Sequence, residues 1–393
     1  MTDLVIVGAG VMGAWTALQA TRAGRNVTLF DAYGAGSPRA TSGDETRITR
    51  ASHGLDQFYV RWSRAAREEW IAFGEEVGAR CFVQAGVVWF AHQEDGFEAT
   101  SLATLREMGV PVERIEVADA ARRWPQVDFG DVAFTIFEPE AGVLMARHSV
   151  AAVSRRVADL GGLVEIASAR PGRVDGPRLL DVELSDGRRV AADQFVFACG
   201  PWLPAMFRDV AGDLIAVTKQ DVVFVGPRAG DARFTDSSLP CWIDYQASYY
   251  GVPSVDGRGF KIAPDRYGEP FDPSSDDRLV DADSIRLARS YLARRFPDIA
   301  DGPIVETRTC QYETTPDTNF VLDRHPAFDN VWLVGGGSGH GFKHGPSIGR
   351  YVTSLLDGHV ADGDELRFRI DRPREVAATG AGARRVIDEA VQG

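Results

Sequence analysis

Four residues near the start of the chain have the types and spacing of a dinucleotide-binding site. Gly8, Gly10 and Gly13 form a G-x-G-x-x-G pattern directly after an apolar run at 4–7. Asp31 closes the next apolar run. The glycines allow a tight turn, a close pyrophosphate and a closely packed helix, while the acid can accept hydrogen bonds from ribose hydroxyls. A lone G-x-G-x-x-G is weak evidence, and a ligand-free turn is the alternative. That alternative leaves Asp31 unexplained, so the sequence predicts a dinucleotide site.

Lysine is rare in this chain, which gives weight to each one present. Lys219, Lys261 and Lys343 are the only lysines among 43 lysine and arginine residues. Arginine therefore supplies the ordinary surface cation. A retained lysine can mark a place that needs a compact ammonium instead of a planar guanidinium. The alternative is compositional drift that left three lysines by chance.

A polar loop at 32–44 is followed by two arginines three positions apart, Arg47 and Arg50. Arginine forks bind carboxylates and phosphates well, so this segment suits a second approach to a cofactor or an anionic substrate. Solvated arginines on an ordinary loop are the alternative. A second glycine-rich loop at 335–345 follows an apolar run and precedes a predicted helix.

The order of the predicted elements indicates two interleaved domains. An apolar run at 194–200 reads as a buried parallel strand that returns to the first sheet, and this return favours FAD over a nicotinamide cofactor. We expect an α/β fold (α+β overall), with a Rossmann-like FAD-binding domain interleaved with an antiparallel-sheet substrate domain. The predicted FAD-binding domain comprises 1–82, 145–212 and 305–372, the substrate or catalytic domain comprises 83–144 and 213–304, and a C-terminal tail covers 373–393.

Composition excludes several classes of protein. The net charge of −13 opposes binding to nucleic acid or anionic membranes. No run of about 18 apolar residues is present, and the N-terminus lacks the basic region of a signal peptide. The cysteines are scattered, without a disulfide framework or metal-ligand spacing, and no G-x-S-x-G elbow occurs. We expect a monomer in a reducing cytoplasm, with no metal site and with small molecules as partners.

An ordered set of segments resembles the monomeric sarcosine oxidase and N-methyltryptophan oxidase group of the D-amino-acid-oxidase-like flavoproteins. The resemblance extends from residue 4 to about 372. The segments that carry it are the first glycine motif, 45–50, 123–125, 136–144, 249–254, Lys261, Cys310 with 315–317, and 337–343.

The resemblance implies roles for residues at the matching positions. Cys310 would bond covalently to the 8α-methyl group of FAD, and a buried inert thiol is the alternative. Lys261 would lie near flavin N5 and accelerate the reaction with O2, an electrostatic effect in a dry site. Arg50 and Lys343 would hold the carboxylate of the substrate.

Further roles follow from the same resemblance. Arg47 would lie against the flavin and Tyr250 near the substrate, and both are candidate catalytic residues. The candidate cofactor-binding residues are Gly8, Gly10, Gly13, Asp31, Ser42, Thr46, Cys310, Gly337, Gly339, His340, Gly341 and Lys343.

Two positions depart from the pattern of the group. Gly43 and Asp265 stand where the group has histidines. Gly43 predicts a roomier pocket, and Asp265 brings a negative charge that could take the proton of the substrate amine. Asp44 and Asp244 are expected nearby. A simple ion pair between Asp265 and Arg266 is the alternative.

These observations predict an FAD-dependent amine oxidase that converts the C–N bond of a secondary or N-alkylated amino acid to an imine and reduces O2 to H2O2. An oxidase for a cyclic imino acid such as pipecolate or proline, in a biosynthetic pathway, is one alternative. The others are a flavin dehydrogenase with a non-oxygen acceptor, an NAD-dependent dehydrogenase, and a flavin-binding protein without catalysis.

Overall fold

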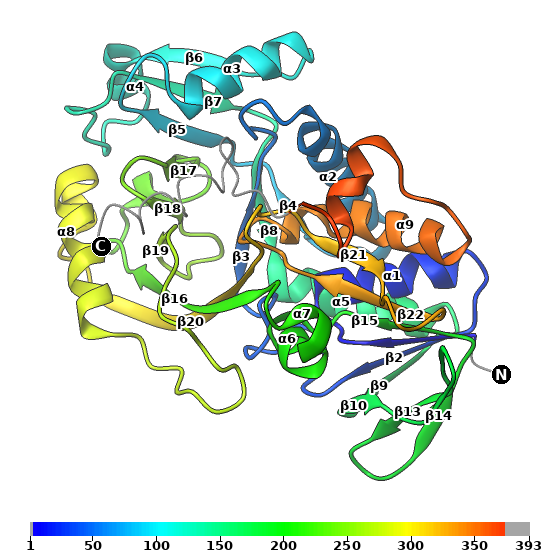
Figure 1. Ribbon diagram of the computed structural model, residues 1–393. Helices are drawn as coiled ribbons and strands as arrows, with labels where there is room; N and C mark the ends of the chain where they lie inside the picture. Colours follow the sequence, from blue (N-terminus) through cyan, green and yellow to red (C-terminus); the bar gives the residue numbers. More distant parts are fainter. Residues whose placement is uncertain (1–2, 374–393) are drawn as a thin grey trace.

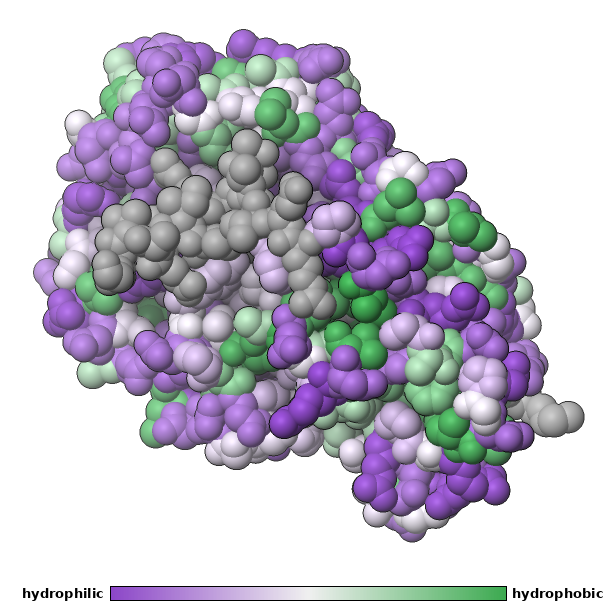
Figure 2. Space-filling view, in the orientation of Figure 1, coloured by the Kyte–Doolittle hydropathy of each residue, from purple (hydrophilic) through white to green (hydrophobic). Residues whose placement is uncertain are grey.

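The computed structural model describes residues 3–373, which fold around two large sheets that lie side by side (Figure 1). The predicted C-terminal tail beyond 373 lies outside the described residues. Within 3–373, no helix has both the length and the apolar character needed to cross a membrane. The described surface is largely hydrophilic, and apolar residues gather near the middle of the face that Figure 2 shows.

The first sheet has six strands, and every neighbouring pair is parallel except the edge pair β21–β22. The predicted return strand is confirmed, because β15 pairs in parallel with β1. In sheet order, the strands are β21 (Val321–Arg324), β22 (Val331–Gly335), β15 (Gln194–Phe197), β1 (Leu4–Val7), β2 (Val27–Asp31) and β9 (Leu163–Ile166).

Both faces of the inner strands are buried, which explains why β1, β15 and β22 read as apolar runs. Leu4 and Ile6 pack with the helices on one face, whereas Val5 and Val7 pack with a small antiparallel sheet and short helices on the other. The helices on the first face are α1 (Val11–Arg22), α2 (Gln57–Val77), α5 (Ala146–Asp159) and α9 (Gly345–Leu356). The opposite face is covered by β10 (Ala169–Pro171), β13 (Asp181–Leu184), β14 (Arg189–Ala191), α6 (Leu203–Met206) and α7 (Arg208–Ala211). A two-stranded sheet, β11 (Val174–Asp175) and β12 (Arg178–Leu179), joins β10 to β13.

The second sheet has eight strands and is antiparallel except for the pair β17–β5. Helices α3 (Phe97–Glu107), α4 (Val117–Arg123) and α8 (Ala282–Arg295) accompany it. In sheet order, the strands are β20 (Ile304–Thr314), β16 (Ala216–Val225), β19 (Phe260–Pro264), β18 (Tyr249–Val252), β17 (Cys241–Asp244), β5 (Val87–Ala91), β7 (Phe134–Glu138) and β6 (Glu113–Glu116).

A three-stranded sheet of β3 (Thr46–Thr49), β8 (Gly142–Met145) and β4 (Phe82–Val83) lies beside the two large sheets. β4 and β5 are separated by a turn in which Gly86 adopts a φ of +75°, a conformation that favours glycine. β20 belongs to the eight-stranded sheet. The domain boundaries inferred from the sequence stay a prediction.

Candidate active site

A cavity of about 370 Å³ is lined by residues of both large sheets and of β3. Its lining joins segments from distant parts of the sequence. Of the predicted site residues, it includes Gly8, Gly10, Asp31, Ser42, Arg47, Arg50, Tyr250, Asp265, Cys310, Gly337, Gly339, His340, Gly341 and Lys343. Gly13, Thr46 and Lys261 are not among the lining residues.

The first glycine turn forms one end of the cavity, and its geometry requires glycine. Gly8 has a φ of +106°, and a Cβ atom there would lie 2.2 Å from the carbonyl oxygen of Ala198. A Cβ atom at Gly13 would lie 1.9 Å from the carbonyl oxygen of Gly8, so α1 can pack against the turn only without a side chain there. Asp31 Oδ2 accepts a hydrogen bond from the N–H of Ala9 at 2.7 Å, and this contact braces the turn.

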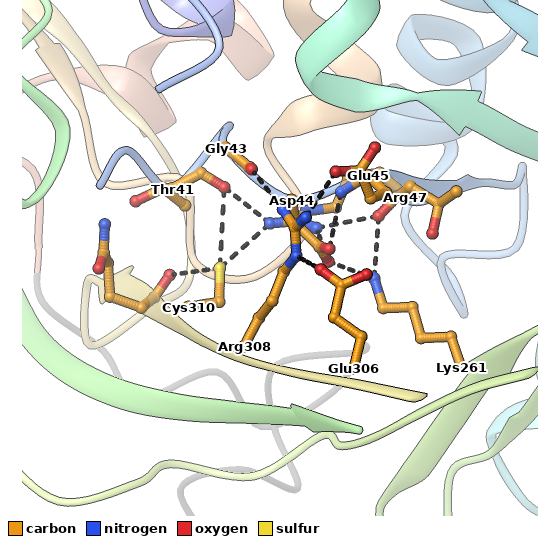
Figure 3. Close-up of polar contacts among 11 residues, drawn as sticks. Thr41, Gly43, Asp44, Glu45, Arg47, Lys261, Glu306, Arg308 and Cys310 are labelled. Atoms are coloured by element: carbon orange, nitrogen blue, oxygen red, sulfur yellow. Dashed lines mark hydrogen bonds and ion pairs between the residues drawn. The ribbon is translucent and has the colours of Figure 1, made fainter. Parts of the chain in front are cut away.

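An ion cluster joins Asp44, which lines the cavity, to Arg47 and Lys261 (Figure 3). The carboxylate oxygen Oδ2 of Asp44 lies 2.5 Å from Arg47 Nη1 and also pairs with Lys261 Nζ. Lys261 donates a second hydrogen bond to the carbonyl of Thr46 at 3.0 Å. Asp44 lines the cavity and Lys261 does not. The carboxylate of Asp44 therefore lies at the cavity wall and offsets part of the positive charge of Lys261.

Burial and charge oppose each other in this cluster. Burial alone would raise the pKa of Asp44, but the charges of Lys261 and Arg47 outweigh it and hold the pKa well below its ordinary value. Burial lowers the pKa of Lys261, although the Asp44 charge resists that change. Two cations therefore share one fully ionised carboxylate in a nearly dry environment.

Cys310 lies on β20 and points its thiol at the same arginine (Figure 3). Arg47 Nη2 donates to Cys310 Sγ at 3.1 Å and to the carbonyl of Thr41 at 2.7 Å. The loop that carries Thr41 also carries Ser42, whose Oγ accepts the N–H of Val11 at 3.0 Å. This loop therefore links the first turn of α1 to the thiol.

Two further cations lie at the cavity wall. Arg50 stacks over Trp89, with Cζ 4.9 Å from a ring centroid, and donates to the carbonyl of Ser52. Lys343 is buried and donates to the carbonyl of His340 at 3.0 Å. Both line the cavity, so they give its wall a positive potential suited to a carboxylate.

Asp265 supplies a negative charge to the same cavity. Its Oδ1 accepts a hydrogen bond from the hydroxyl of Tyr312 at 3.3 Å. Tyr312 lies two residues after Cys310 on β20, and both side chains face the cavity, as the period of a strand requires. Tyr312 was not among the predicted site residues, although its spacing from Cys310 indicates the same face of the strand.

Two expectations about nearby residues are wrong. Gly43 does not line the cavity, and a Cβ atom there would lie 1.9 Å from the carbonyl oxygen of Ser37. The loop backbone fills the space, so Gly43 does not enlarge the pocket. Asp244 also lies away from the cavity, since its carboxylate is bound to His92 at 2.8 Å and Arg295 at 3.2 Å.

Glu313 is a second residue that the sequence did not reveal. It lines the cavity, and a Cβ atom at Gly200 would lie 3.3 Å from its Oε1. Burial raises the pKa of Glu313 from 4.5 to about 7. With a pKa of about 7, this carboxyl group carries only part of a negative charge at neutral pH, beside the turn at Gly200.

The chain is similar to known proteins along nearly its whole length. A family model described as FAD dependent oxidoreductase matches residues 3–355. The chain belongs to this family. It is 29% identical to the monomeric sarcosine oxidase of Streptomyces avermitilis, covering 96% of this chain and 99% of the relative. It is 25% identical to the N-methyl-L-tryptophan oxidase of Salmonella dublin, covering 94% and 98%. The predicted resemblance is confirmed.

The fold agrees with this assignment. The crystal structure of L-proline dehydrogenase from P. horikoshii superposes with a TM-score of 0.82, at 21% identity over 94% of this chain and 96% of that chain. The chain is thus an FAD-dependent oxidoreductase with a Rossmann-like domain and a second domain built on an antiparallel sheet, as predicted.

The residues of this cavity fit FAD. Gly10 leaves the backbone open to a pyrophosphate, since a Cβ atom there would meet only Ser42 Oγ, at 3.5 Å, and Asp31 lines the cavity at the same turn. The cavity continues from there to Arg47 and Cys310, so it is long enough to reach residues of the second sheet. Which atoms hold the cofactor stays a prediction.

Because Arg47 and Lys261 share the carboxylate of Asp44, the effects of substitutions at Asp44 and Lys261 on the free energy of unfolding should not be additive. Asp44→Asn leaves two buried cations without their counter-ion and should lower the free energy of unfolding by about 3–5 kcal/mol. The double variant Asp44→Asn/Lys261→Met removes one of those cations and should recover part of the loss, as measured by urea unfolding. Arg286→Met is the control, because Arg286 pairs with Asp283 at an exposed site and should lose under about 1 kcal/mol. Additive losses in the double variant would contradict the shared-carboxylate geometry.

The raised pKa of Glu313 predicts a pH-dependent difference from Glu313→Gln. The folded-state pKa lies above the unfolded one, so the ionised carboxylate costs stability increasingly as the pH rises from about 4.5 to about 7. Relative to wild type, the stability of Glu313→Gln should therefore rise over this range by up to about 3 kcal/mol. Urea unfolding at pH 5 and pH 8, with Glu306→Gln as the control, measures it. A pH-independent difference would contradict the shift.

Proposed function

We propose that this flavoprotein is an amine oxidase that converts the C–N bond of a secondary or N-alkylated amino acid to an imine, with O2 reduced to H2O2. The observation that carries the proposal is the pairing of charges at the cavity wall. Arg50 and Lys343 suit a carboxylate, while Asp265 suits an ammonium. A zwitterionic amino acid presents both groups. The names of the sarcosine and N-methyltryptophan oxidases support the same substrate class.

The side chains of the cavity then have distinct tasks. Arg50 and Lys343 bind and orient the substrate carboxylate, and Tyr250 contacts the substrate from β18. An amino acid amine has a pKa near that of lysine, about 10, so it must lose a proton before oxidation. The cations lower that pKa and Asp265 accepts the proton. Bound FAD supplies the two-electron acceptor for the C–N oxidation.

Lys261 is proposed to favour the reaction with O2. Its surroundings also support the main alternative function, which is a flavin dehydrogenase with a non-oxygen acceptor. Because Asp44 pairs with both Lys261 and Arg47, three charges leave a net charge of one positive unit at this wall. That residual charge supports stabilisation of superoxide as it forms. A carboxylate between the lysine and the cavity weakens the effect, which favours a dehydrogenase that passes electrons to another acceptor.

Cyclic imino acids such as proline or pipecolate remain the second substrate class. The aromatic residues Trp89, Tyr245 and Tyr250 line the cavity together with Asp265. Flat apolar walls next to an acid suit a ring that contains a secondary amine. We propose that the protein acts as a monomer in the cytoplasm on one of these two classes.

A substrate screen tests the reaction. Sarcosine, N-methyl amino acids, proline and pipecolate are supplied in air, and H2O2 is measured with a coupled peroxidase. At least one should give peroxide, and turnover only with an artificial electron acceptor would establish the dehydrogenase instead. Lys343→Met removes one hydrogen-bonded charge and should raise KM about 10- to 100-fold. Lys219→Met, outside the cavity, should leave KM unchanged.

Covalent attachment of FAD through Cys310 is proposed because the buried thiol lines the cavity beside Arg47. After acid precipitation, the flavin colour of the wild-type protein should stay in the pellet, whereas Cys310→Ala should release it to the supernatant. Cys199 also lines the cavity, so Cys199→Ala is a matched control that should keep the colour. Complete release of flavin from the wild type would refute the linkage.

A further inference from the structure

Three histidines from opposite ends of the chain meet behind the cavity. His53 precedes α2, His340 lies in the second glycine loop, and His344 ends the short helix η4 (Phe342–His344) at the start of α9. One ring nitrogen of each lies within 4.8 Å of the ring nitrogens of the other two. His340 lines the cavity, while His53 and His344 lie deeper.

Backbone carbonyls fix the tautomers of two of these rings. His53 Nδ1 lies 2.8 Å from the carbonyl oxygen of Ala51, and His340 Nε2 lies 3.0 Å from the carbonyl oxygen of Thr318. A carbonyl can only accept, so each of these nitrogens carries a hydrogen. In a neutral imidazole the second nitrogen then has the lone pair that a metal ion needs. The same arrangement orients histidine ligands in metalloproteins.

His344 gives an independent sign of a missing ligand. Its side chain has an exposed fraction of 0%, and neither ring nitrogen has a hydrogen-bond partner among the described residues. His53 Nε2 is likewise buried without a partner there. An unsatisfied buried polar group costs about 1–3 kcal/mol, so such groups in a folded protein need an explanation.

The surroundings define the chemistry of that ligand. The rings of Tyr59, Trp62 and Phe320 contact the histidines, so the surroundings of the cluster are aromatic. The cluster contains imidazoles without carboxylate or thiolate ligands. Such a set suits Zn²⁺ and related ions and does not suit Mg²⁺ or Ca²⁺, which prefer oxygen.

We propose that His53, His340 and His344 form a three-imidazole site for a zinc-class divalent cation. Tetrahedral Zn–N bonds of about 2.1 Å place ligand nitrogens about 3.4 Å apart, so the rings close by about 1.4 Å at most. The fourth ligand is an anion such as hydroxide or chloride, because the charges of Arg50 and Lys343 act on the same cluster.

Metal binding to the purified holoprotein, without an affinity tag, tests the site. After treatment with EDTA, the protein is dialysed against Zn²⁺, and bound metal is measured by mass spectrometry. One ion per chain is expected. His53→Phe and His344→Phe should each lower the bound metal at least tenfold. His325→Gln is the matched control, since His325 is buried outside the cluster, and it should bind as the wild type does.

Two further measurements keep the proposal falsifiable if a variant fails to fold. Zn²⁺ should raise the Tm of the wild type, and Co²⁺ should give tetrahedral absorption bands at wavelengths beyond those of oxidised flavin. Less than one tenth of an equivalent of Zn²⁺ on the wild type would overturn the proposal. Equal binding by the wild type and both folded phenylalanine variants would also overturn it.

Discussion

The carboxylate of Asp44 is the contact on which the centre of this molecule depends. It joins Arg47 on β3 to Lys261 on β19, and so ties the small linking sheet to the eight-stranded sheet. A buried ion pair gains little net stability over an apolar replacement, but loss of one partner is costly. The cluster therefore serves to hold these side chains in position, more than to add net stability. It fixes Arg47, which in turn fixes the thiol of Cys310 and the loop at Thr41.

The charged side chains at the cavity form two groups, the ion cluster at Asp44 and the pair Arg50 and Lys343. Lys261 and Arg47 share a carboxylate, so their combined charge is partly cancelled. Arg50 and Lys343 donate to backbone carbonyls and line the same cavity, where they are proposed to bind the carboxylate of the substrate.

The sequence predicted those features that depend on local patterns. Gly8 and Gly13 indicated the turn and the helix contact because the backbone leaves no space for a Cβ atom there. The lysine count directed attention to Lys261 and Lys343, both of which are buried near the cavity wall. Gly43 was misread because a missing side chain says nothing about what fills the space, here the loop at Ser37. Asp244 was misplaced because successive side chains of an extended strand point to opposite faces: Ile243 and Tyr245 line the cavity, and Asp244 between them does not.

The histidine cluster shows why the remaining features could not be predicted from the sequence. Metal sites are recognised in sequences by ligands that lie close together, as on one helix or one hairpin. His53 lies in the first sixth of the chain, and His340 and His344 lie near its end, so only the packing of α2 against α9 brings them together. The same packing buries them among aromatic rings and removes water as a hydrogen-bond partner. Their chemistry is therefore a property of the interleaved fold, in which each functional group depends on a contact between distant segments.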